Sequence, residues 1–153
     1  MLDTTADVWP TWLGLTVASL AVAGVAVGLP AAPPPDPEPV AATVDATAAS
    51  PHTEREVVPV EASQIRLTPR GIALRSQGGT AHATLTRSVV PVRGPPLQRV
   101  LDGAPPASVY DSRAAFREAL RVAKDREPRW RPAPPRLTVR RVHWRGVDAT
   151  LVG

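Results

Sequence analysis

Hydrophobic and polar residues alternate along short segments between residues 55 and 92. Alternation with a period of two is typical of strands that bury one face against a core. The pattern predicts four strands, over residues 55–60, 64–68, 71–76 and 80–87. Pro69-Arg70-Gly71 and Gln77-Gly78-Gly79 are typical of tight turns and predict an antiparallel meander. Residues 89–92 are expected to add an edge segment only, because Pro91 has no N–H to donate to a ladder.

The C-terminal third of the chain combines helical and strand patterns. The main helix is predicted over residues 113–126, where the apolar positions share one face: Phe116, Ala119, Leu120 and Ala123. Asp111 or Ser112 can cap its start, and Pro128 ends it. A shorter helix is expected over 97–101, and two last strands over 136–144 and 147–152. The expected fold class of this part is α+β, with a small antiparallel sheet packed against one main helix.

Residues 8–29 form an apolar stretch of 22 residues without a charge. At about 1.5 Å per residue, a helix of this length would cross a hydrocarbon layer of about 30 Å. One N-terminal transmembrane helix is therefore expected, with a cleaved secretory signal or a helix buried in a globular core as the alternatives. Gly24 and Gly28 have the spacing of small residues at which membrane helices associate, so helix association is a further hypothesis.

Proline separates the apolar stretch from the rest. Six of the ten residues from Pro30 to Pro39 are proline, which predicts an extended and stiff spacer. Residues 40–50 either form a short helix or continue this linker. The predicted organisation is a short tail, a transmembrane helix, a Pro/Ala-rich linker and a small basic domain, over residues 1–7, 8–29, 30–54 and 55–153 respectively.

Charge is distributed unevenly along the chain. Residues 1–54 contain six acids and no Lys or Arg, whereas residues 55–153 contain all 18 basic residues and the other eight of the 14 acids. The two parts therefore carry about −6 and +10. Seventeen of the 18 cations are Arg, which reflects either a selected basic surface or a bias in the coding sequence.

Several of these cations recur in patterns that predict a surface for an anionic partner. Four of them lie on one face of the predicted helix, where like charges repel unless they are screened or meet an anion. Others alternate with Trp130 or precede Trp144, as in surfaces that combine phosphate contacts with stacking. The candidate residues are Arg113, Arg117, Arg121, Lys124, Arg129, Arg131, Arg140 and Arg141. The alternative is a solvated helix face and arginine stems that lie over packed tryptophans.

Catalytic and metal-binding patterns are missing from the sequence. There is no cysteine, and His52, His82 and His143 stand singly, without the short spacing of metal ligands. No nucleophile elbow and no phosphate-binding loop motif occurs. We therefore expect no enzyme activity, no cofactor, no bound metal and no small-molecule substrate.

Four segments carry a resemblance to a known family: WPTWLGLTVASLAVAGVAVGLP, PPPDPEP, RGIALRSQGGTAHATL and REPRWRPAPPRLTVRRVHWRGVDATLVG. Together they resemble a family of small, uncharacterised membrane proteins of halophilic archaea, over nearly the whole chain. The resemblance implies association with pilin-like subunits and secretion-type ATPases, in a type IV pilus-like or type II secretion-like apparatus. It assigns no catalytic residues.

The function expected from these observations is that of a single-pass membrane protein with a structural or interaction role. It would be an accessory component of an envelope assembly, held in the lipid bilayer, with its C-terminal domain outside the cell and its arginine surface bound to a protein partner. The alternative is a cytoplasmic-facing, arginine-rich module that binds nucleic acid or anionic lipid.

Overall fold

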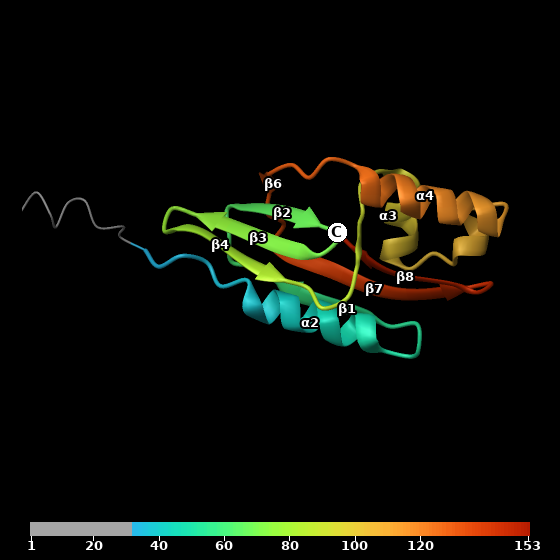
Figure 1. Ribbon diagram of the computed structural model, residues 1–153, viewed down its shortest axis with the longest axis horizontal. Coiled ribbons are helices and arrows are strands. Elements are labelled where there is room, and N and C mark those ends of the chain that lie inside the picture. Colours follow the sequence, from blue (N-terminus) through green and yellow to red (C-terminus); the bar gives the residue numbers. More distant parts are fainter. Residues whose placement is uncertain (1–31) are drawn as a thin grey trace, which may run out of the picture. The chain divides into compact units, whose positions relative to one another are not determined.

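Residues 32–153 are described by a computed structural model (Figure 1). The helices are α2 (Glu38–Ala49), α3 (Pro95–Asp102) and α4 (Arg113–Asp125), with one 3-10 turn, η1 (Pro106–Ser108). The strands are β1 (Arg55–Pro59), β2 (Gln64–Thr68), β3 (Gly71–Ser76), β4 (Gly79–Thr84), β5 (Val90–Pro91), β6 (Arg131–Pro132), β7 (Arg136–Trp144) and β8 (Val147–Val152).

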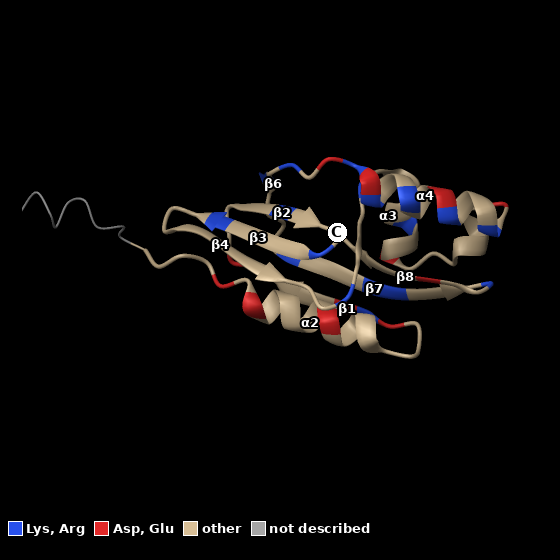
Figure 2. Ribbon diagram, viewed as in Figure 1, with Lys and Arg blue, Asp and Glu red and all other residues tan. Residues whose placement is uncertain are grey.

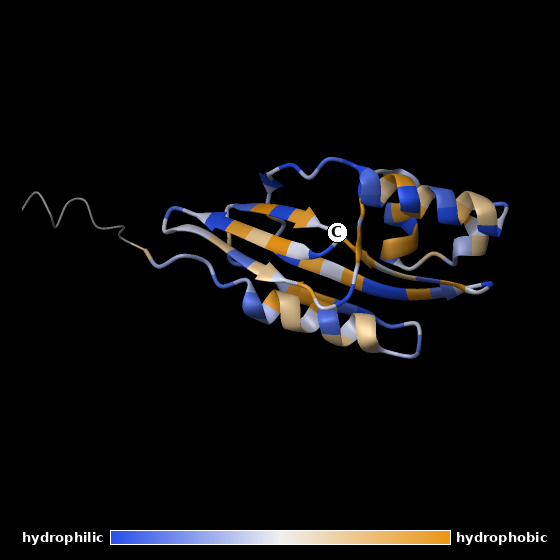
Figure 3. Ribbon diagram, in the orientation of Figure 1, coloured by the Kyte–Doolittle hydropathy of each residue, from blue (hydrophilic) through white to orange (hydrophobic). Residues whose placement is uncertain are grey.

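The strands form two four-stranded sheets. The first sheet has the order β1-β7-β8-β5, and the second has the order β4-β3-β2-β6. In the first sheet β7 pairs antiparallel with β1 and β8, while β5 pairs parallel with the last two residues of β8. Every pair in the second sheet is antiparallel, and two-residue turns join β2 to β3 and β3 to β4, where the sequence predicted tight turns. Figure 3 shows hydrophobic and hydrophilic residues alternating along β2.

β7 connects two separate cores because its nine residues are long enough to reach both. Leu137 and Val139 point into the first core, which β7 shares with α2 and the second sheet. Val142 points into the second core, below α3 and α4. Odd and even positions of a strand face opposite sides. The strand therefore buries its odd-numbered residues in its first half and an even-numbered residue, Val142, in its second half. Figure 1 shows β7 running from the region of α2 toward that of α3 and α4.

α2 belongs to the first core. Val40, Ala41 and Val44 are buried there, and Pro39 lies in the first turn, where the missing N–H leaves no helical hydrogen bond unmade. The linker expected over residues 30–54 thus contributes a helix to the compact unit, because small apolar residues at helical spacing fill the space over β1 and β7.

The predicted fold class needs correction in its sheet and helices. One antiparallel sheet against one main helix was expected, but there are two sheets, one of which contains a parallel pair. α2 and α3 cover the first sheet in addition to α4. The prediction was wrong because it assumed that each strand buries one face along its whole length. β7 instead buries opposite faces in its two halves.

The prediction of a single-pass membrane protein is also corrected. No helix among residues 32–153 combines the length and the apolar character that crossing a membrane requires. The segment 8–29, for which a transmembrane helix was predicted, lies outside the described residues, as do Gly24 and Gly28. The membrane localisation and the placement of the domain outside the cell are accordingly not retained.

Candidate functional site

α4 carries the longest run of the candidate cations. Ser112 caps its start by accepting a hydrogen bond from the backbone N–H of Ala115 at 3.1 Å. Phe116, Leu120 and Ala123 are buried in the second core. Each of these buried residues is followed directly by a cation, and consecutive helical residues are about 100° apart. The cations therefore lie along the flank of the core-facing stripe.

A groove of about 380 Å³ separates this flank from the hairpin of β7 and β8. We call it the α4 groove. Its lining residues are Arg117, Leu120, Arg121, Lys124, Gly146, Val147 and Asp148. Figure 2 shows Lys and Arg along α4 and at the tip of the β7–β8 hairpin. The structure thus brings three of the eight candidate residues to one groove.

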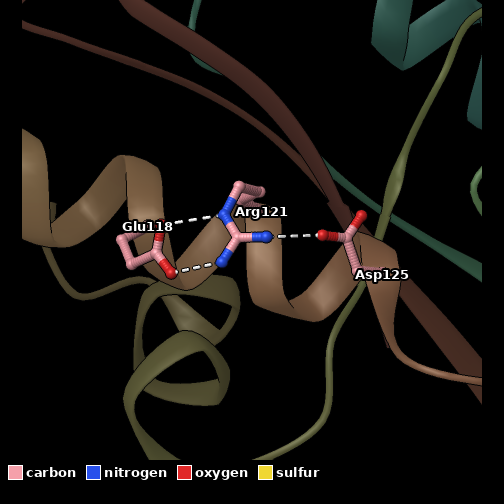
Figure 4. A network of polar contacts seen from close by, with 3 residues as sticks. All are labelled: Glu118, Arg121 and Asp125. Carbon is pink, nitrogen blue, oxygen red and sulfur yellow. Dashed lines mark hydrogen bonds and ion pairs between the residues drawn. The ribbon is translucent and has the colours of Figure 1, made fainter.

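The charge of Arg121 is offset within α4 (Figure 4). Its guanidinium contacts Glu118 at 2.6 Å and Asp125 at 2.7 Å. The hydrogen bond from Arg121 lowers the pKa of Glu118, and the same contact raises the pKa of Arg121. All three side chains are more than half exposed, so these ion pairs contribute little to stability. Their main consequence is that Arg121 has both neighbouring acids of the helix as partners.

Arg117 and Lys124 differ from Arg121 in this respect. Within residues 32–153 neither of them forms an ion pair or a side-chain hydrogen bond, and both are exposed. Arg113, one turn before Arg117, donates from Nη1 to the carbonyl of Arg145 at 3.5 Å, at the tip of the hairpin.

The acid on the opposite wall of the groove is also paired. Asp148 lies across the hairpin from His143, and the Nδ1 of His143 donates to its carboxylate at 2.8 Å. Arg141 approaches the same carboxylate at 3.5 Å. The hydrogen bond from His143 is the main cause of a lowered pKa of Asp148, and the charges of His143 and Arg141 lower it further. Within the described part of the chain, the positive charges at the groove without a partner are those of Arg117 and Lys124.

Arg140 has a different place from Arg141, although the two are adjacent. Its Nη1 donates to the carbonyls of Val100 and Ala104, at the end of α3. The carbonyl of Val100 also accepts from the backbone N–H of Gly103, and Arg140 adds a charged donor at this C-terminal end of the helix. Burial lowers the pKa of Arg140, and the charge of Arg55 adds to this effect. Arg140 therefore caps a helix and does not join the α4 groove.

The remaining candidates, Arg129 and Arg131, lie in and after the loop that follows α4. Arg129 is highly exposed and lies 3.6 Å from Glu127. Arg131 pairs with β2 and is half-buried, and burial lowers its pKa. Trp130 lies between them in sequence and is covered by guanidinium groups of its own chain, at 5.0 and 4.1 Å from the ring centroid for Arg66 and Arg75.

Metal coordination has no candidate in the part of the chain that the structure describes. No three side chains of His, Asp or Glu are grouped there so that they could hold an ion. His52, His82 and His143 lie in the loop before β1, in β4 and in β7.

The sequence did not identify the hairpin wall of the groove. The turn at Arg145-Gly146 was expected to join two strands, and this pairing places residue 148 opposite residue 143. The side of the hairpin that faces α4, however, depends on a tertiary contact. The ring of Trp144 packs edge-on against Phe116 at 5.7 Å between centroids.

Comparison with known proteins gives one match. The profile of a family described as of unknown function, DUF7283, matches residues 3–142. No curated protein and no solved structure matches the chain.

Proposed function

The chain belongs to DUF7283, a family of unknown function, and we propose that it is a non-catalytic interaction protein whose α4 groove binds an acidic segment of a protein partner. One observation carries this proposal. Among residues 32–153 the acids at the groove have ion-pair partners, whereas the cations Arg117 and Lys124 that line it have none.

Electrostatics favours an acidic occupant of this groove. An exposed ion pair contributes about 0.2–1 kcal/mol, so two such contacts alone would give weak binding. Complementary charge also raises the rate of encounter and excludes basic partners. A short acidic segment would therefore bind weakly and reversibly, in a manner that added salt weakens.

β8 contributes little exposed surface to the same occupant. Its burial pattern leaves Asp148 as the exposed residue of the strand, whereas Val147, Ala149 and Thr150 are buried. The groove therefore offers an acidic segment mainly the side chains of α4.

Binding of nucleic acid is less well supported. Stacking on bases needs open aromatic faces, but Trp130 lies beneath Arg66 and Arg75. Trp144 packs on Phe116 and has Arg145 over its ring at 5.2 Å.

The assembly to which the partner belongs is proposed from the resemblance of the sequence. The resemblance of the sequence implies a pilus-like or secretion-like apparatus of a halophilic archaeon, and this part of the proposal depends on that resemblance alone.

The test is a titration of a fluorescent eight-residue Asp/Glu peptide with the full chain, followed by anisotropy. The double variant Arg117→Gln/Lys124→Gln should weaken binding about tenfold, because each contact contributes up to about 1 kcal/mol. The control Arg87→Gln/Arg136→Gln removes the same charge from exposed positions outside the groove and should retain affinity.

Equal loss in both double variants would contradict the proposal, since binding would then depend on net charge only. A single-stranded oligonucleotide of the same length provides the competing outcome. If it binds more tightly than the peptide, and loses affinity in the groove variant, nucleic acid replaces the acidic segment as the occupant.

A further inference from the structure

A second surface, unrelated to the α4 groove, lies on the outer face of the second sheet. The register of β2, β3 and β4 places side chains there in rows across the three strands. One row is Arg66, Ala73 and His82, and the next is Thr68, Gly71 and Thr84. The middle strand contributes the small residue to each row. The face therefore forms a trough along β3, which we call the outer trough.

The floor of the outer trough has to be small. A Cβ added at Gly71 would lie 3.2 Å from the carbonyl oxygen of Ala83 and 3.3 Å from Oγ1 of Thr68. Thr68 approaches this closely because its hydroxyl donates to the carbonyl of Gly71 at 3.2 Å. The hollow above the floor measures about 190 Å³, which is about six times the share of liquid volume taken by one water molecule.

The walls of the trough carry hydrogen-bond donors and no acid. Arg66 and Thr68 stand on one side, and His82 and Thr84 stand on the other. The guanidinium of Arg66, an imidazole N–H of His82 and the hydroxyl of Thr84 can donate to an oxygen, whereas the hydroxyl of Thr68 already donates to Gly71. Donors on two opposite sides suit a ligand with acceptor oxygens in several directions.

Arg66 is both fixed in place and incompletely satisfied. Its guanidinium lies over Trp130, 5.0 Å from the ring centroid, and Arg75 lies over the same ring at 4.1 Å. Arg75 is in turn held by Thr80 at 3.2 Å and Gln64 at 3.4 Å. The Nε of Arg66 is buried and has no hydrogen-bond partner within the described residues. The terminal nitrogens of Arg66 likewise make no hydrogen bond among the described residues, so the guanidinium keeps donors for a ligand that lies in the trough.

From this geometry we propose that the outer trough binds a phosphate-type oxyanion, with Arg66 and His82 on opposite sides of the anion and the hydroxyl of Thr84 at one end. The chemistry is that of a phosphoryl group, either as free phosphate or as the end of a small phosphate ester. Arg66 presents its donors in a fork that matches such oxygens. The sequence did not reveal this site, because its residues are far apart along the chain and meet only through the register of three strands.

The experiment is an NMR titration of the isotope-labelled full chain with inorganic phosphate, against sodium chloride at matched ionic strength. Amide signals of residues 71, 73 and 82 should shift and saturate. Arg66→Gln should weaken phosphate binding about tenfold or more, since a charge-assisted hydrogen bond is lost. Ala73→Val should abolish it by filling the floor, while the β-branched residue suits a strand. Arg117→Gln, in the α4 groove, should leave it unchanged.

Glycerol 3-phosphate is the second probe, and it distinguishes a phosphate ester from free phosphate as the ligand. Binding equal to or tighter than that of phosphate supports an ester ligand, and exclusion of the ester supports free phosphate. Shifts that do not saturate, or that spread over exposed arginines, would indicate an adventitious ion only and overturn the proposal. So would unchanged binding in Ala73→Val. None of these results affects the acidic segment proposed for the α4 groove, so the two proposals fail separately.

Discussion

Arg140 and Arg141 are adjacent in β7, and the sequence assigned both to one anion-binding surface. They lie on opposite faces of the strand. Arg140 donates to the carbonyls of Val100 and Ala104 at the end of α3, whereas Arg141 forms a partly exposed ion pair with Asp148. Replacing each by alanine should therefore have very different effects on stability.

The expected difference follows from the contacts. A hydrogen bond from a charged donor contributes about 1.5–3 kcal/mol, and a cation at a helix C-terminus adds about 0.3–1 kcal/mol. Arg140 is only partly buried, and water can replace part of its contacts in the variant. We expect Arg140→Ala to cost about 2–3 kcal/mol and Arg141→Ala about 0.5 kcal/mol or less, since a solvated ion pair is weak.

Urea unfolding followed by circular dichroism measures both variants. With a slope of about 2 kcal/mol per molar urea, Arg140→Ala should lower the midpoint by about 1 M or slightly more, and Arg141→Ala should leave it nearly unchanged. The slopes must agree with that of the parent chain. Equal and small decreases in the urea midpoint of both variants would refute the helix-capping role of Arg140.

Two further predictions concern acidic residues. Asp45 of α2 accepts hydrogen bonds from the backbone N–H groups of Thr86 and Arg87 at 3.0 and 3.2 Å. Asp45→Ala should lower the free energy of unfolding by about 1 kcal/mol, and Asp45→Asn, which keeps an acceptor, by less; equal losses in the urea midpoint would argue against these bonds. The pKa of Asp148 is lowered in the folded chain, so its contribution to stability is complete above its ordinary value of 3.8 and is lost as the pH falls through the lowered value. Asp148→Asn should reduce the dependence of unfolding on pH in that acidic range, and an unaltered acid-unfolding curve would contradict the assignment.

Local patterns predicted much of the secondary structure but little of its assembly. The alternation in 64–68 and 71–76 and the apolar spacing of α4 gave elements that the structure contains, because each depends on burial of one face. The same reasoning failed for β7. Leu137 and Val142 have opposite parity, and both are buried because different layers cover the two ends of the strand.

The candidate cations fall into two groups, those that lie together on α4 and those that make separate tertiary contacts, for a similar reason. Arg117, Arg121 and Lys124 lie together because helical spacing alone determines their face. Arg131 and Arg140 instead make contacts that depend on tertiary structure. Arg131 pairs with β2, and Arg140 donates to carbonyls at the end of α3. The outer trough was missed altogether, since a cross-strand row becomes visible only when the strand order and register are known.

The central claim is that the α4 groove recognises negative charge through Arg117 and Lys124, and a reversal of charge tests it most directly. The affinity of Arg117→Glu/Lys124→Glu is measured for the Asp/Glu peptide and for a Lys peptide of equal length. We expect the parent chain to bind only the acidic peptide and the reversed variant to prefer the basic one. Continued preference of the reversed variant for the acidic peptide would contradict the account.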